Sequence, residues 1–530
     1  MIRFSHAVSL GILFLALAAC GRAPAPGASE APSAVSPRDR LRHIVERYWD
    51  EHAALGDSPS PQSQADSLAL ERRFLAEFLT VPRASLDADS RLTYDIFRRQ
   101  RESAIEGFTY PEELLPVNPF AGMPIELARS AADTEQHPFK TAGDYENWLL
   151  RIDDYVRWTR QAIENMRDGM RRGYTEPKVL TARMLPLLQG FGEDTSASVF
   201  YTPLRTLPRS IQDPERTRLV MSLTGAVRDK LLPAYRELHD FIQNEYLPRA
   251  RTSVALSALP LGPSWYAYRV RRATDTQLAP DEIHGMGKAE VERIRARMQA
   301  FPAGAPPSGA AAQSNTIQEM QAQTLAAMPA LFSGVPQADV QIVPAAARPA
   351  SMDMASFLRE EIPGRRYQAM LQRARTDLPR FRRLGGDAAF VDGWALYAGS
   401  LGEELGLYRD DGAKRSALLS QLKCAVALVV DTGLHAKGWT RAQAVDYLHA
   451  QLAPDDADVD LMTDRFIALP GDALACKMGE LKIRALRAQA QQVLGARFDI
   501  REFHAEILKD GAMPVDILEA KMRLWMEAGR

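Results

Sequence analysis

Apolar residues recur at spacings of three and four from Asp39 to the end of the chain, which is the period of one face of an α-helix. The pattern is clearest over residues 141–171, 216–246, 281–299 and 413–430. Helix starts are indicated by Thr141 and Thr440, which precede helical patterns as caps, and by Pro280. The best strand signal is the alternating run 339–344. The sequence therefore predicts a mainly α, large multi-helix fold with a small β element.

The chain divides loosely into two helical regions. An apolar, proline-containing stretch at 257–262 separates them, so we expect an N-terminal helical region at 39–260 and a C-terminal one at 261–530. The second region carries the motifs described below. Within it, residues 302–314 are of low complexity and indicate a loop or an insertion.

Composition excludes several classes of protein. The 530 residues are 46% hydrophobic and 25% charged, which is typical of soluble globular domains and not of disordered chains. Lys and Arg number 65 and Asp and Glu 67, a net charge of −2. A protein that neutralises phosphates along its surface would be more basic, so we expect no nucleic-acid partner.

The N-terminus has the pattern of a secretory signal. Arg3 precedes an apolar run over residues 8–19 that is too short to span a membrane comfortably. Cys20 directly after Leu-Ala-Ala resembles the lipobox of bacterial lipoproteins, although an ordinary signal peptide beside an unrelated cysteine is the alternative. We therefore expect a signal peptide at 1–19 and a lipidated Cys20 with a flexible tether at 20–38. The membrane is then a partner through this lipid. We expect the periplasmic side of the envelope, at the outer membrane, because no acidic retention signal follows Cys20.

Two further cysteines, Cys424 and Cys476, lie in the region expected to fold. They could pair in an oxidising compartment, but separation along the chain says nothing about proximity. The expectation for each is a free, buried thiol.

The segment 357–368 contains the most unusual pattern. Arg359 and Glu360 end an apolar helical stretch that Pro363 and Gly364 interrupt. Residues six apart on an ideal helix do not share a face, and proline removes a helical hydrogen bond. A distortion at this point could bring Arg359 and Arg365 together.

Four other segments hold candidate functional residues. Asp392 stands at the head of an apolar helical pattern, Asp431 and His435 are spaced i, i+4, and Lys477 lies in a glycine-flanked stretch. The aromatic residues of the segment 265–268 could line a cleft, although core packing is the commoner role; they are Trp265, Tyr266 and Tyr268.

These blocks together resemble the bacterial domain of unknown function 885 family. The resemblance is carried by Trp-Tyr-Ala-Tyr-Arg at 265–269, Leu-Ala-Pro-Asp-Glu-Ile-His at 278–284, Ile-Pro-Gly at 362–364, Phe-Val-Asp-Gly-Trp-Ala-Leu-Tyr at 390–397, Val-Asp-Thr-Gly-Leu-His at 430–435 and Lys-Met-Gly-Glu-Leu-Lys-Ile at 477–483. It implies a largely helical, often secreted lipoprotein similar to zinc metallopeptidases of the gluzincin kind. The family shares His-Glu-Ala-Ile-Pro-Gly-His-His and, further on, Glu-Gly-Trp-Ala-Leu-Tyr.

This chain departs from that pattern at the reactive centre. Arginines stand where the family has histidines, namely Arg359, Arg365 and Arg366. The acid before Gly-Trp is Asp392 in place of Glu, and Cys476 replaces a tyrosine. Arginine has no lone pair to donate to a metal, so we expect no zinc and no other cofactor, with Glu360 as a relic general base.

Besides a solvated basic face, two interpretations of the arginines are open. In one, they form ion pairs with Glu360, Glu361 and Asp392 that fill the former metal cavity. In the other, they line a pocket for a carboxylate or phosphate. The candidate ligand-binding residues are then Arg359, Arg365, Arg366, Trp265, Tyr268 and Lys477.

The interpretation favoured by the sequence is a non-catalytic binding or regulatory lipoprotein with a peptidase-shaped cleft for an anionic or peptide ligand. The alternative is a hydrolase of peptides or amides. It would use a relocated zinc or metal-free acid–base chemistry, with candidate catalytic residues Glu360, Asp392, Asp431 and His435. A structural envelope protein is a third possibility.

Overall fold

The computed structural model describes residues 35–56, 58–132, 139–301, 317–334, 352–452 and 459–529. Over these ranges the chain is helical and contains no strand, only an isolated bridge between Pro177 and Arg251. The predicted mainly α, multi-helix fold is confirmed. The signal peptide, Cys20, most of the tether and the expected strand at 339–344 lie outside the described residues.

The N-terminal half contains nine α-helices in the described residues, and the sequence indicated the start of one of them. Thr141 caps the longest of them with its side chain, as predicted. The bounds are α1 (Pro37–Leu55), α2 (Pro61–Phe78), α3 (Ala88–Gly107), α4 (Met123–Ala132), α5 (Ala142–Arg172), α6 (Lys178–Gly192), α7 (Thr202–Arg205), α8 (Glu215–Ala226) and α9 (Leu232–Phe241).

The helices of the C-terminal half carry the motifs. Pro280 opens one of them and Thr440 caps another, again as predicted. The bounds are α10 (Gly262–Thr274), α11 (Pro280–Met298), α12 (Ile317–Ala327), α13 (Met354–Glu360), α14 (Arg365–Ala374), α15 (Arg380–Leu384), α16 (Ala388–Ser400), α17 (Asp411–His435), α18 (Arg441–Gln451), α19 (Val459–Ala468), α20 (Leu474–Leu494), α21 (Ile500–Leu508) and α22 (Val515–Ala528).

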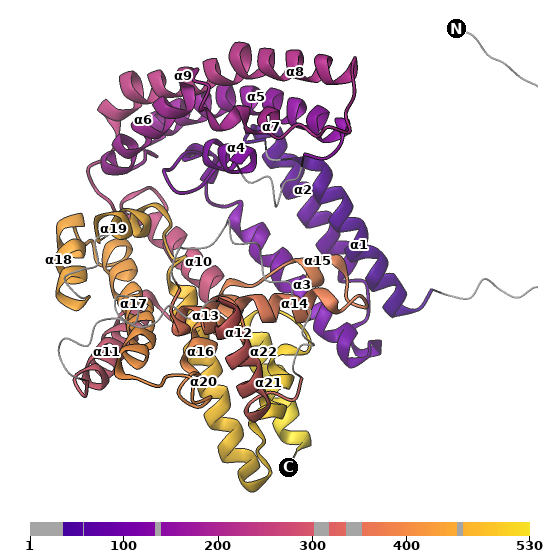
Figure 1. Ribbon diagram of the computed structural model, residues 1–530, viewed down its shortest axis with the longest axis vertical. Coiled ribbons are helices and arrows are strands. Elements are labelled where there is room, and N and C mark those ends of the chain that lie inside the picture. Colours follow the sequence, from indigo (N-terminus) through magenta and orange to yellow (C-terminus); the bar gives the residue numbers. More distant parts are fainter. Residues whose placement is uncertain are drawn as a thin grey trace, which may run out of the picture.

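The helices group around several apolar cores (Figure 1). Helices α4–α9 form the layer at the top of Figure 1 around one core, while α17, α18 and α19 share another at the left. The largest core joins α1, α2 and α3 to helices of the C-terminal half, including α13, α16 and α20. Helices α1, α2 and α3 therefore stabilise the part of the chain that carries the motifs.

Helices α16 and α20 cross at unusually close range because each presents a glycine at the crossing. A Cβ on Gly393 would lie 2.4 Å from the carbonyl carbon of Gly479, and one on Gly479 would lie 1.8 Å from the carbonyl oxygen of Ala389. Both glycines belong to motif blocks. They hold Asp392 and Lys477 on adjacent helices at a fixed spacing.

Helix α17 is the one described helix that is long and apolar enough to cross a membrane by length and composition. Its most apolar window is 83% buried among the other helices. It therefore serves as a core helix here, and it carries Cys424, Asp431 and His435 into the interior.

Candidate functional site

The helical pattern breaks at the predicted position. Helix α13 ends at Glu360 and α14 begins at Arg365, with a cis peptide between Ile362 and Pro363. Gly364 is required at this break, since a Cβ there would lie 1.9 Å from the carbonyl oxygen of Arg359. The tight turn brings positions 359 and 365 to the same side, where both contact Glu360.

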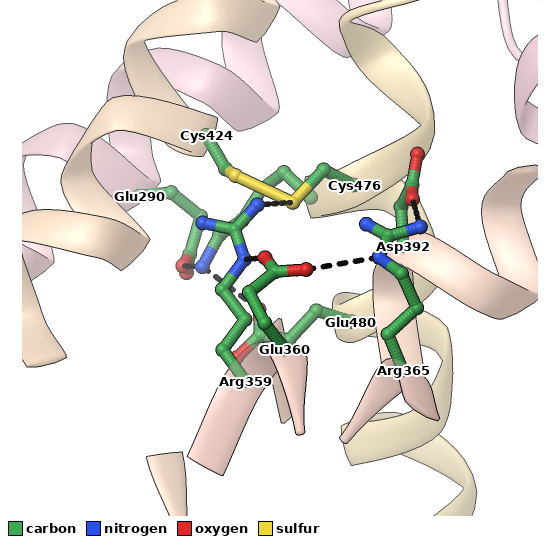
Figure 2. Close-up of a disulfide and its surroundings, with 9 residues drawn as sticks. Glu290, Arg359, Glu360, Arg365, Asp392, Cys424, Cys476 and Glu480 are labelled. Carbon is green, nitrogen blue, oxygen red and sulfur yellow. Dashed lines mark hydrogen bonds and ion pairs between the residues drawn. A yellow bond between two sulfur atoms is a disulfide. The ribbon is translucent and has the colours of Figure 1, made fainter. Parts of the chain in front are cut away.

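Arg365 lies between two carboxylates (Figure 2). Its Nε is 3.1 Å from Oε2 of Glu360 and its Nη1 is 2.6 Å from Oδ1 of Asp392. Burial alone would lower the pKa of Arg365, but Asp392 and Glu360 outweigh it and raise that pKa. Arg365 therefore joins α14 to α16 as a permanent cation.

The other two motif arginines also have acidic neighbours. Nε of Arg359 is 3.2 Å from Oε1 of Glu360, and Nε of Arg366 is 2.6 Å from Oε2 of Glu361. These contacts are the ones that the ion-pair interpretation predicts. The guanidinium groups of all three arginines are thus directed at carboxylates of their own chain.

Cys424 on α17 and Cys476 on α20 form a disulfide, with Cα atoms 6.1 Å apart. The expectation of two free thiols was wrong, because the fold brings two helices 52 residues apart in sequence into contact at these positions. Nη2 of Arg359 lies 4.0 Å from Sγ of Cys476. Figure 2 shows Arg359 between the disulfide and Glu360.

Lys477 is fully buried beside this cluster. Its Nζ lies 2.8 Å from carboxylate oxygens of both Glu290 and Glu480. Burial would raise the pKa of Glu290, but Arg293 and Lys477 outweigh it and lower the pKa to about 2. Arg484 also pairs with Glu480. This placement makes Lys477 the centre of an internal charge network and gives no support to the ligand-binding role expected of it.

Asp431 and His435 are also fully buried. Asp431 accepts hydrogen bonds from the Tyr266 hydroxyl at 2.6 Å and from the Gly471 amide. Nδ1 of His435 accepts from the Leu256 amide at 3.0 Å, so its Nε2 donates to the Phe466 carbonyl at 2.9 Å. Burial lowers the pKa of His435 to about 4. Both ring nitrogens of His435 therefore have partners. The hydrogen bonds of His435 and Asp431 are structural, and neither residue lies beside Glu360.

The aromatic residues of α10 pack in the core. Trp265 and Tyr268 are 2% and 3% exposed, and both stack on Tyr110. The Tyr268 hydroxyl donates to the Ser103 carbonyl. Tyr268 also reaches the wall of a cavity of about 730 Å³, whereas Trp265 does not.

A second cavity, of about 530 Å³, lies beside the motif cluster and is called the arginine pocket here. Its wall includes Asp392 and Cys476, and its charged residues are Arg269, Arg272, Arg465, Asp392 and Asp472. Asp392 is already paired with Arg365, and Arg269 with Glu112. In the described part of the chain, neither Arg272 nor Arg465 has a hydrogen bond or an ion pair within 4.0 Å. Both act electrostatically on Asp472 in the same wall, where they oppose the burial that raises the pKa of that carboxyl group.

Sequence reasoning missed the arginines of this pocket. Arg269 belongs to the aromatic block, but Arg272 and Arg465 stand in no motif and come from α10 and α19. It also missed His504, buried beside Trp394, whose Nε2 accepts from the Tyr397 hydroxyl at 2.9 Å. Burial lowers the pKa of His504 to about 4. No local signal marks these residues, because their significance comes from the packing of distant helices.

The residues at the motif positions do not fit a zinc ion. A catalytic zinc site takes about three nitrogen, sulfur or carboxylate ligands and keeps one position open. Here positions 359, 365 and 366 are arginines, which are cationic and have no lone pair. Nowhere among the described residues do three or more His, Cys, Asp or Glu side chains form a group suited to a metal. Glu360, Asp392 and His435 in particular do not converge.

Fold and site together define a class: large all-helical proteins whose motif segments meet around an interrupted helix and an adjacent cavity. Within that class, the chain belongs to the family described as bacterial protein of unknown function (DUF885), whose model matches residues 46–345 and 339–522. No curated protein matches the chain.

Two solved structures share the fold. A candidate lipoprotein from Colwellia psychrerythraea is 23% identical, with a TM-score of 0.79 over 93% of this chain and 100% of its own. A candidate lipoprotein of unknown function from Shewanella oneidensis is 14% identical, with a TM-score of 0.68 over 92% of this chain and 100% of its own. At these identities the likeness establishes the fold alone.

Proposed function

We propose that this chain is a lipid-anchored protein on the periplasmic side of the envelope, with a metallopeptidase-like scaffold and a degenerate zinc site. It binds an anionic or peptide ligand without cleaving it. The signal-like N-terminus with Cys20 supports the anchor, as do the names of the two structural neighbours. The disulfide supports an oxidising compartment.

The loss of catalysis is supported chiefly by Arg365. Its guanidinium occupies the space between Glu360 and Asp392, the carboxylates that correspond to the base and a ligand in the family pattern. A divalent cation at this position would meet a fixed positive charge and no imidazole. Glu360 then has no metal-bound water to deprotonate.

Ligand binding is supported by the arginine pocket. The motif arginines are engaged by carboxylates, so we assign the ligand contacts to Arg272 and Arg465. Guanidinium groups hold carboxylates and phosphates through paired hydrogen bonds, which water competes with less well in a cavity than at an open surface.

The test uses the full-length chain purified in detergent. We expect no stoichiometric zinc, no hydrolysis of a mixed peptide library, and a higher Tm in the presence of succinate or inorganic phosphate. A ligand at 100 times its Kd stabilises by about 2.7 kcal/mol. The double variant Arg272→Gln, Arg465→Gln should lose this stabilisation, whereas Arg157→Gln, an exposed arginine on α5, should keep it.

Two results would contradict the proposal. Stoichiometric zinc whose removal abolishes peptide hydrolysis would establish the hydrolase alternative. A Tm that neither anions nor peptides change would favour a structural role without a ligand.

A further inference from the structure

A separate cavity of about 190 Å³, called the amide pocket here, lies between α11, α16, α17 and α20. It shares no wall residue with the arginine pocket. Pockets for drug-sized ligands measure about 300–1,000 Å³, so the amide pocket suits a smaller molecule. Eight of its eleven wall residues are polar or charged, which favours a polar ligand over an apolar one.

Helix α17 forms one wall of the amide pocket. Lys414, Ala417, Leu418 and Gln421 all line the cavity and are spaced i, i+3, i+4 and i+7. Seven residues are about two helical turns, so Lys414 and Gln421 lie on the same face of α17. The wall therefore has a polar side chain at each end and apolar side chains between them.

The amide of Gln421 lacks a partner at its acceptor. Gln421 is 4% exposed, yet its Oε1 has no hydrogen-bond partner among the described residues. Buried acceptors without a donor are rare in folded proteins because they cost free energy. A side-chain amide accepts through Oε1 and donates through Nε2, and hydroxyl groups both donate and accept. A ligand that carries hydroxyl groups therefore suits this amide.

The acids of the wall already have counter-ions. Glu403 lies 3.6 Å from Arg297, and Glu404 lies 2.7 Å from Arg487. Lys414, by contrast, forms no ion pair with any described residue. An anionic group on a ligand would supply its counter-ion.

Arg484 of α20 is the remaining charged residue of the wall. It pairs with Glu480, and its Nη2 donates to Oγ of Ser400 at 2.6 Å. In the described part of the chain, the uncompensated charge of the wall is therefore the single positive charge of Lys414. A ligand with one negative charge balances it.

We propose that the amide pocket binds a small sugar acid, a monocarboxylate with several hydroxyl groups, whose carboxylate contacts Lys414 and whose hydroxyl groups contact the Gln421 amide. This inference goes beyond the proposed function, because it concerns a second site with a ligand class of its own. The carboxylate satisfies the unpaired ammonium group, and a hydroxyl group satisfies the unpaired acceptor.

The test compares three six-carbon probes: gluconate, sorbitol, which lacks the carboxylate, and hexanoate, which lacks the hydroxyl groups. The full-length chain in detergent carries Arg272→Gln and Arg465→Gln, so that anions in the arginine pocket do not contribute. Calorimetry should show that gluconate binds at least about tenfold more tightly than either of the other probes.

Two further substitutions in this background locate the site. Gln421→Met keeps the length of the side chain and removes its hydrogen bonds, so gluconate should bind no better than hexanoate. Lys414→Gln removes the charge, so gluconate should bind no better than sorbitol. Arg415→Gln, the matched control, removes a charge from the next position on α17, outside the wall, and should leave all three affinities unchanged.

A readout without ligand checks the role of Gln421. Replacing a buried acceptor that lacks a donor by an apolar group should leave the Tm of the ligand-free chain equal or higher. A lower Tm for Gln421→Met would show that the fold itself satisfies the amide and would overturn the inference.

The remaining outcomes separate this inference from the proposed function. Gluconate that binds no better than sorbitol or hexanoate would overturn the sugar-acid site and leave the arginine pocket untouched, since succinate and phosphate test that pocket. Tight gluconate binding that persists in both Lys414→Gln and Gln421→Met would overturn the assignment to the amide pocket.

Discussion

The disulfide between Cys424 and Cys476 permits the most direct quantitative prediction. It closes a loop of 52 residues between α17 and α20. Crosslinking a loop of this length lowers the entropy of the unfolded chain by about 14 cal/mol/K, which stabilises the fold by about 4 kcal/mol at 25 °C. We expect the variant Cys424→Ala, Cys476→Ala to be less stable by about this amount.

The assay is thermal unfolding with and without reductant. Unfolding entropy is about 2.1 cal/mol/K per residue, or about 1.1 kcal/mol/K for 530 residues, so the Tm should fall by about 4 °C. Reductant should lower the Tm of the wild type to that of the double variant and leave the double variant unchanged. The single variant Cys424→Ala is the matched control and should behave like the double variant.

Thiol titration supplies the decisive check. The unreduced, denatured chain should expose no thiol from Cys424 or Cys476. Two reactive thiols there, or a reduced wild type with an unchanged Tm, would refute the reasoning from loop closure.

Three further predictions concern the core and the motif cluster. Gly479→Ala should destabilise the fold by at least about 3 kcal/mol in urea unfolding, since its Cβ would overlap the Ala389 carbonyl of α16; Gly190→Ala, in open space, should be nearly neutral. The pKa of His435 is about 4 in the folded state, below its unfolded value of about 6.5. As the pH falls from 6.5 towards 4, the unfolded chain binds a proton at His435 that the folded chain does not, so stability is lost. By pH 5 the wild type loses about 2 kcal/mol of folding free energy through His435. The variant His435→Gln cannot titrate, so its stability relative to the wild type should rise by that amount between pH 7.5 and pH 5. The variant Arg359→His, Arg365→His should acquire zinc measurable by metal analysis, and a failure to do so would show that the ligand positions are assigned incorrectly.

The helical architecture and the geometry of the motif break could be predicted from local pattern. Apolar spacing sets the helices, and Pro363 with Gly364 forces the turn that brings Arg359 and Arg365 to Glu360. Both depend on interactions between residues close in sequence. For the same reason, Thr141 and Thr440 identified helix starts correctly.

The pairing of distant elements could not be predicted. Cys424 and Cys476 meet only because α17 and α20 pack together, and separation in sequence carries no information about that contact. The arginine pocket likewise combines α10 with α19. Lys477 was a ligand-binding candidate in its glycine-flanked segment, yet Gly479 of that segment serves the close approach of α16, and Lys477 is buried.

The bridging position of Arg365 has an evolutionary consequence. Replacing it alone by a neutral imidazole leaves Glu360 and Asp392 facing each other without their shared counter-ion, so a first step towards a metal ligand lowers stability before any metal can bind. Several positions would have to change together for a zinc site to form. Selection acting one codon at a time therefore opposes the gain of such a site, and descendants of this sequence should retain the arginine even where their ligands diverge.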